Sequence, residues 1–126
     1  MKIVVIIART LLGIVFLFFG LNGFLHFIPA QMPPGLAGQF AGAMAQSHYD
    51  LVVSGIQVIG GVLLLVNRFV PFALTILGPV IVNILLFHFL LFPVGWQPGV
   101  VCALLWIFLF IRYRQYFSGI FVQRAG

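Results

Sequence analysis

Four long apolar stretches occupy most of this 126-residue chain, over residues 3–27, 51–66, 71–92 and 97–111. A helix needs roughly 20 apolar residues to cross a bilayer, so four such helices and their connections use nearly the whole length. The pattern predicts an all-α fold, a transmembrane four-helix bundle that forms a single integral-membrane domain over residues 1–126. No part of the chain is left for a separate soluble catalytic domain.

The basic residues lie at alternate ends of these stretches, which predicts their orientation. Lys2 precedes the first stretch and Arg68 lies between the second and the third. The basic residues after the fourth stretch are Arg112, Arg114 and Arg124. The two other connections contain no Lys or Arg. Since short cytoplasmic loops retain basic residues, we expect both termini in the cytoplasm and a multi-pass topology.

The composition indicates which kinds of partner the chain can contact. Hydrophobic residues make up 63% of the chain and charged residues 6%, against about 25% charged residues in soluble domains. The lipid bilayer is therefore the expected partner. The net charge of +5 is explained by topology and by anionic lipid headgroups, so no nucleic acid is expected. The single cysteine, Cys102, excludes an internal disulfide, and we expect it to be a small apolar side chain in the fourth span.

The first outer connection and the third span each contain a local signal. Leu36, Phe40 and Met44 recur every four residues behind Pro34, a pattern compatible either with a short helix in the outer interface or with an irregular loop. In the third span, Pro79 predicts a kink near the centre.

Polar side chains inside the spans are the best candidates for a ligand-binding site, because polar groups are costly in a bilayer. His48 and Asp50 are expected at the outer boundary of the membrane. At 1.5 Å per residue, five further polar residues fall in the outer half. They are Asn22, His26, Gln57, Asn83 and His88. Because three spans contribute them at similar depth, we expect a site that opens outward.

Helical phase distinguishes some of these candidates. Asn22 and His26 share a face, whereas Asn83 and His88 point roughly 140° apart, so we assign Asn83 to the bundle interior and His88 only secondarily. Amides can also act as packing contacts between helices, at around 0.6 kcal/mol each, without any ligand. His26 and His88 could in principle hold a haem, but two histidines are a weak pattern and no metal site is predicted.

Arg9 is an intramembrane charge whose only acidic counterpart in the sequence, Asp50, is expected at the opposite face, on the order of 20 Å away. Three explanations are open. The guanidinium reaches the headgroups, it is satisfied by carbonyls or water within the bundle, or it contacts an anionic ligand or partner. The residues that share its helical face are small or aromatic, which would let another helix approach. They are Gly13, Phe16, Gly20, Gly23 and Phe27.

Two segments carry a family resemblance. Residues 9–13, Arg-Thr-Leu-Leu-Gly, with residues 16–23, and residues 60–71, from the Gly-Gly pair to Asn67-Arg68-Phe-Val-Pro71, resemble DoxX-type membrane proteins. The resemblance implies a small four-helix protein of the bacterial cytoplasmic (inner) membrane. Some relatives are associated with thiosulfate oxidation coupled to quinone reduction, and others with complexes that include a superoxide dismutase and a sulfurtransferase. The family often has an acidic residue where this chain has Gln57, and an amide cannot take up a proton as a carboxylate can.

Three functional hypotheses follow. The first is an accessory or interaction subunit of a membrane redox complex, with redox-enzyme proteins as partners. The second is a quinone-linked oxidoreductase subunit of the thiosulfate:quinone type, in which Asn22, His26, Gln57 and Asn83 surround a quinone ring. The third is a small-solute carrier. The residues assign no catalytic group and no cofactor of their own, with a quinone compatible with the polar cluster, and they leave homo-oligomerisation open.

Overall fold

The computed structural model describes residues 2–26 and 33–123, and this part of the chain is helical without strands. The long helices are α1 (Lys2–Leu25), α3 (Tyr49–Val66), α4 (Val70–Leu86) and α5 (Gln97–Arg112). The short elements are α2 (Gly35–Gln46), the π-helical turn η1 (Phe87–Leu91) that continues α4, and the 3₁₀ turns η2 (Arg114–Tyr116) and η3 (Ser118–Phe121). The predicted all-α bundle is confirmed.

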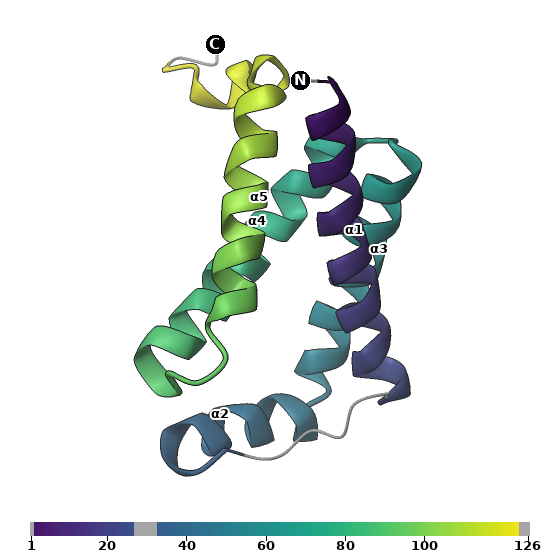
Figure 1. The fold of residues 1–126 in the computed structure, drawn as a ribbon. Helices are drawn as coiled ribbons and strands as arrows, with labels where there is room; N and C mark the ends of the chain where they lie inside the picture. The colour runs from purple at the N-terminus through teal and green to yellow at the C-terminus, as the bar shows by residue number, and fades with distance from the viewer. Residues whose placement is uncertain (1, 27–32, 124–126) are drawn as a thin grey trace.

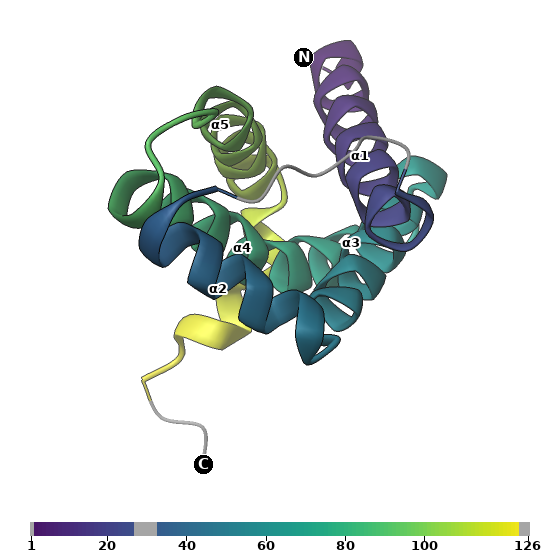
Figure 2. The ribbon, with the colours of Figure 1, turned by 90° about the horizontal axis from the view of Figure 1, so that it is seen from below.

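Four of these helices form the bundle, and α2 lies across one end of it (Figure 1). The most extensive contact is between α1 and α3, and smaller contacts join α3 to α4, α4 to α5 and α5 to α1. The view in Figure 2 shows α2 crossing the ends of α3 and α4. Both chain termini and the α3–α4 connection lie at the opposite end from α2 (Figure 1).

This arrangement separates the charges along the bundle axis. Lys2 begins α1, Arg68 lies in the α3–α4 connection and Arg112 ends α5, so all three belong to the end of the bundle that carries the termini. We call it the basic end. Asp50, in the first turn of α3, belongs to the end that α2 covers. Arg124 and Phe27 lie outside the described residues.

Three of the described helices are long and apolar enough to cross a membrane. They are Lys2–Leu25, Tyr49–Val66 and α4 with its π-helical continuation, Val70–Leu91. α5 is also apolar but has only 16 residues, shorter than an average span. Large hydrophobic side chains on these helices are exposed, as on Ile7, Phe18 and Leu104. Their exposure is compatible with contact to lipid.

The first connection contains the helix that the four-residue spacing allowed. α2 has Pro34 at its N-cap and buries only Ala37, while Leu36 stays 67% exposed. Its ring contact is Phe40 against Phe87 of η1, with centroids 5.8 Å apart. α2 therefore packs against the bundle through one face, and its other face keeps apolar surface exposed.

Glycines set how closely α1 and α3 pack. A Cβ on Gly61 would lie 2.6 Å from the backbone nitrogen of Leu17, and a Cβ on Gly13 would lie 3.0 Å from the carbonyl oxygen of Gly61. A Cβ on Gly20 would meet the α3 backbone in the same way. The small-residue face predicted on α1 is thus its contact with α3, and backbone meets backbone there.

The neighbouring glycine of α3 serves a different helix. A Cβ on Gly60 would lie 2.7 Å from the side chain of Leu77 on α4. Leu77 is fully buried, together with other large side chains that form the centre of the bundle. These are Leu12, Phe16, Leu64, Leu74 and Leu109. The Gly60-Gly61 pair therefore lets α3 approach two helices on adjacent faces.

Trp106 of α5 forms a hydrogen bond to α4. Trp106 donates its Nε1–H to the carbonyl oxygen of Leu74 at 2.8 Å, and its ring lies over Gly78, where a Cβ would be 3.2 Å away. α4 is one continuous α-helix through Pro79, and its departure from α-helical geometry comes at Phe87, where the π-helical turn begins.

The glycine contacts predict a position-specific cost. Gly61→Ala places a methyl group against the backbone of α1, so the helices must separate, at about 1–3 kcal/mol of stability. Gly55→Ala in the same helix is the matched control, because only Phe24 lies within 4.0 Å of its Cβ. Thermal unfolding in mild detergent should show a lower midpoint for Gly61→Ala and an equal or higher one for Gly55→Ala. Equal effects of the two variants would contradict the close packing.

Candidate functional site

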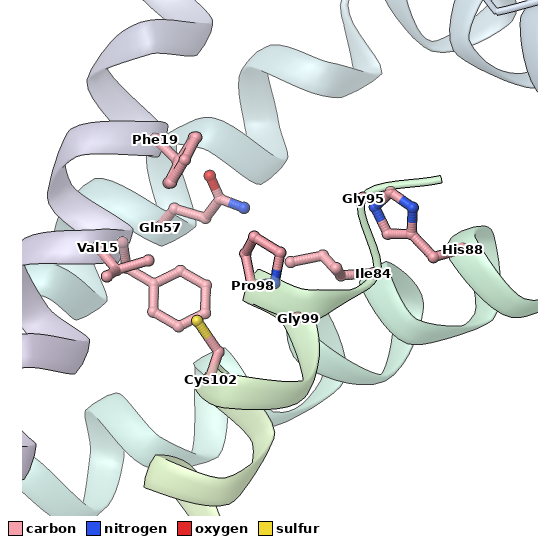
Figure 3. A pocket seen from close by; sticks show the side chains of 10 residues that line it. Val15, Phe19, Gln57, Ile84, His88, Gly95, Pro98, Gly99 and Cys102 are labelled. Atoms are coloured by element: carbon pink, nitrogen blue, oxygen red, sulfur yellow. The ribbon is translucent and has the colours of Figure 1, made fainter. Parts of the chain in front are cut away.

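A cavity of about 290 Å³ lies between α1, α3, the end of α4 and the start of α5. Its volume is near the lower end of the range typical of small-molecule sites. Figure 3 shows its lining side chains, which are mostly apolar. α1 contributes Val15, Phe16 and Phe19, α3 contributes Gln57, and α4 with η1 contributes Ile84 and His88. The remaining lining residues are Gly95, Pro98, Gly99 and Cys102.

Gln57 is the polar group that α3 presents to this cavity. Its side chain extends from α3 into the space between Phe19 and Pro98 (Figure 3). It is half-buried, and within the described ranges its amide makes no hydrogen bond. An amide can donate and accept, so Gln57 is equipped to bind either a carbonyl or a hydroxyl group.

His88 reaches the cavity from the π-helical turn η1. Its Nδ1 lies 3.2 Å from the carbonyl oxygen of Phe92. A carbonyl oxygen only accepts, so Nδ1 is the donor in this bond, and Nε2 is an acceptor in the neutral tautomer that makes it. The ring also meets Phe87 edge to face, with centroids 5.2 Å apart. π-helical turns recur at functional sites, because they reposition a side chain within an otherwise regular helix.

Gly95 and Cys102 close the cavity on the side of α5. Gly95 has a φ of +81°, which a residue with a side chain rarely adopts, and it lies beside the His88 ring (Figure 3). Cys102 is buried and its sulfur points towards the α1 wall of the cavity (Figure 3). It is a free thiol. The expectation of an ordinary apolar packing residue thus omitted that Cys102 lines the cavity.

Two of the five outer-half candidates line the cavity, Gln57 and His88. Asn22 is half-buried on α1 outside the cavity lining. His26 is exposed just after α1, with a φ of 55°, and its backbone N–H donates to the carbonyl oxygen of Asn22 at 2.8 Å. Of the outer-half polar groups expected to form one site, the cavity therefore brings together Gln57 and His88, and His26 lies outside its lining.

Asn83 was assigned to the wrong face. It is exposed, and its Nδ2 donates to the carbonyl oxygen of Pro79 at 2.9 Å, one turn back on its own helix. The buried face of α4 runs through Leu77 and Ile81, and a continued spacing of three and four residues reaches Ile84 and His88. Once the structure shows which apolar face of α4 is buried, the same spacing selects His88 and not Asn83.

The two boundary residues flank the start of α3. His48 is exposed at the N-cap with a φ of 62°, and Asp50 is half-buried in the first turn. A carboxylate is favoured there by the positive end of the helix dipole. In the part of the chain that the structure describes, no three His, Cys, Asp or Glu side chains are grouped so that they could hold a metal ion.

Arg9 is buried, 9% exposed, and is satisfied inside the bundle. Its Nη1 donates to the carbonyl oxygen of Leu64 and, at 3.4 Å, to that of Leu65, both in the last turn of α3. The backbone N–H groups of Asn67 and Arg68 bond to Leu64 and Leu63, which leaves the oxygen of Leu65 to Arg9. Of the three explanations, carbonyls within the bundle are the observed one.

The C-terminal end of α3 is also an electrostatically favourable place for the positive charge of Arg9. Carbonyl groups at a helix C-terminus carry partial negative charge, so a cation is stabilised there. Asp50 lies 14 residues before Leu64 on the same helix, about 21 Å along its axis, which agrees with the expected separation from Arg9. The last turn of α3, rather than an acidic side chain, is therefore the electrostatic partner of Arg9.

Comparisons with known proteins add no assignment. No family model, no curated protein and no solved structure matches the chain. The function must be argued from the geometry of the cavity and of the helix contacts.

Removing the guanidinium should destabilise the bundle. Arg9→Met keeps a long apolar side chain but leaves the α3 carbonyls without this donor, so we expect a loss of about 2 kcal/mol and a midpoint lower by several degrees. Arg68→Met, which removes an exposed charge at the same end, should change stability by less than about 0.5 kcal/mol. Thermal unfolding in detergent measures both. A stable Arg9→Met protein would show that the contact contributes little.

Proposed function

We propose that the chain is a multi-pass protein of the bacterial cytoplasmic membrane in which four helices span the bilayer and both termini are cytoplasmic. Three helices are long and apolar enough to span. α5 covers about 24 Å, and the aromatic residues at its ends, Trp96 and Tyr113 with Tyr116, suit the two interfaces. The described Lys and Arg residues other than Arg9 belong to the basic end, which supports a cytoplasmic position for that end.

Labelling on either side of α5 tests this topology where the helix is shortest. In a Cys102→Ala background, Val94→Cys and Ser118→Cys place one exposed thiol before α5 and one after it. A membrane-impermeant maleimide should label Val94→Cys in intact spheroplasts and Ser118→Cys only after lysis. Labelling of both from the same side would mean that α5 does not cross.

We further propose that the protein is a DoxX-like accessory subunit of a membrane redox complex. The two segments that carry the resemblance contact each other in the fold. Arg9 bonds to Leu64 and Leu65, and Gly13 packs on Gly61. The shared residues thus build the α1–α3 contact of the basic half, and the ligand chemistry falls to the cavity in the other half.

The cavity supports a specific form of this role, the binding of a quinol headgroup for the complex. The observation that carries the proposal is the Gln57 amide, which points into an aromatic cavity without a hydrogen bond from the described residues. The amide is half-buried and accessible from the cavity, so a hydroxyl or carbonyl ligand there would give it a hydrogen-bond partner. Phe16 and Phe19 supply apolar ring contacts, and Nε2 of His88 supplies an acceptor.

The acceptor on His88 favours the reduced form of the ligand. A quinol hydroxyl can donate to Nε2, whereas a quinone carbonyl cannot. Gln57 can bind an oxygen of either form. The chain's own groups therefore orient the ring and accept a hydrogen bond from it.

Binding of a decyl-chain benzoquinol and its quinone to the purified protein tests the cavity. Calorimetry in mild detergent should give tighter binding of the quinol, with Gln57→Leu weakening it about fivefold, the equivalent of one lost hydrogen bond. Asn83→Leu makes the same change outside the cavity and should leave the dissociation constant unchanged. His88→Phe should remove the preference for the quinol. Equal weakening by Gln57→Leu and Asn83→Leu would refute the site.

The subunit role is tested in a separate experiment, before the protein is purified. Crosslinking in native membranes followed by mass spectrometry should recover a redox enzyme with the protein. Repeated recovery of the protein alone would contradict the subunit proposal, independently of whether the quinol binds.

A further inference from the structure

A second concave surface is lined by α4 and α5 and shares no lining residue with the Gln57 cavity. It is a groove of about 490 Å³ between α4 and α5, with an almost wholly apolar lining. On α4 it extends from Thr75 to Leu85, about 15 Å along the helix. This length is half of the roughly 30 Å apolar thickness of a bilayer, which is the depth filled by the acyl chains of one leaflet.

Three aromatic rings form one wall of this groove. Trp106 stacks on Phe110 with centroids 5.2 Å apart, and Phe110 contacts Phe117 at 4.7 Å. Trp106 is held in place by its bond to Leu74, and Gly78 leaves room beneath its ring. The rim is exposed, since Val82 and Ile107 are 55% and 48% accessible. The groove is therefore preformed and open along its side.

The groove ends at the basic end of the bundle. Its last lining residues are Phe117, between η2 and η3, and Ile120 in η3, and they come a few residues after Arg112 and Arg114 in the sequence. Both arginines are exposed. Arg114 donates Nη1 to the carbonyl oxygen of Ile111 at 3.0 Å, which uses a single donor of a group that carries several.

The arginines at this end carry charge that an anion would offset. The sequence has six basic residues and one acidic residue, Asp50, which lies at the other end of the bundle. Within the described residues, neither Arg112 nor Arg114 therefore has a carboxylate side chain near it. An arginine fork matches the geometry of a phosphate group.

We propose that the α4–α5 groove is a binding site for one anionic phospholipid, with an acyl chain along Trp106 and Phe110 and the phosphate at Arg112 and Arg114. A second copy of the chain fits this surface less well. In a parallel pair, the partner would bring its own arginines to the same end, and like charges would repel. An acyl chain brings no such charge, and its headgroup neutralises the arginines.

Native mass spectrometry of the detergent-purified protein tests the site, with phosphatidylglycerol and phosphatidylcholine of identical acyl chains as probes. The wild-type protein should retain phosphatidylglycerol preferentially. Arg112→Gln with Arg114→Gln should lower the ratio of the two bound lipids about 25-fold, whereas Lys2→Gln should lower it much less. Equal retention of both lipids by the wild type would overturn the proposal.

The acyl-chain part is tested by filling the groove. Ile107→Trp places a large side chain in it, and Leu104→Trp makes a similar change on an exposed residue of α5 outside the lining. The first should abolish retained phosphatidylglycerol and the second should not. Val82→Trp fills the groove from the α4 wall and gives an independent variant should Ile107→Trp fail to fold. A dimer that Ile107→Trp dissociates, without any lipid bound, would overturn the proposal in favour of a second copy.

Discussion

The contact between the Arg9 guanidinium and the last carbonyls of α3 sets the geometry on which the candidate site depends. α1 and α3 run antiparallel, so one fixed contact determines the register of the whole pair. Phe16 lies seven residues after Arg9, and Gln57 lies seven residues before Leu64. Seven residues are about two turns and 10.5 Å on each helix. The register that pairs Arg9 with Leu64 therefore also brings Phe16 and Gln57 to the same level, where both line the cavity.

The glycines between these two levels make that register exclusive. Gly13 and Gly61 lie between the Arg9 contact and the cavity, and each leaves no room for a Cβ. A shift by one residue would bring the side chain of Leu12 or Ile14 against the α3 backbone. The hydrogen bonds of the Arg9 guanidinium hold α1 against α3, and the glycines exclude other registers of the two helices. The level of Gln57 in the bundle is therefore set by the contacts of Arg9 and of the two glycines, which lie elsewhere on the two helices.

Apolar length and charge placement sufficed to predict the helices, because in a membrane the solvent dictates both the length of an element and the position of its basic residues. That Gln57 and His88 lie at a similar level of the bundle was predictable from their positions along the apolar stretches. The face that a side chain presents was not, because α4 is apolar on all sides and offers no clear amphipathic contrast. Asn83 was misplaced on that account. The hydrogen-bond partner of Arg9 could not be identified from the sequence either. Every residue has a backbone carbonyl group, so the residue type does not show which one accepts the bond.

Gln57 gives the cavity a different chemistry from the acidic residue that its DoxX resemblance suggests. A carboxylate at this level would take up a proton or attract a cation, and it would carry a charge into the apolar half of the bundle. An amide avoids that cost and still holds an oxygen atom, but it cannot remove a proton from it. In the proposed site the Nε2 atom of His88 is the acceptor that faces the ligand. In the proposed site, Gln57 would orient the ring, and His88 would distinguish its reduced form from its oxidised form.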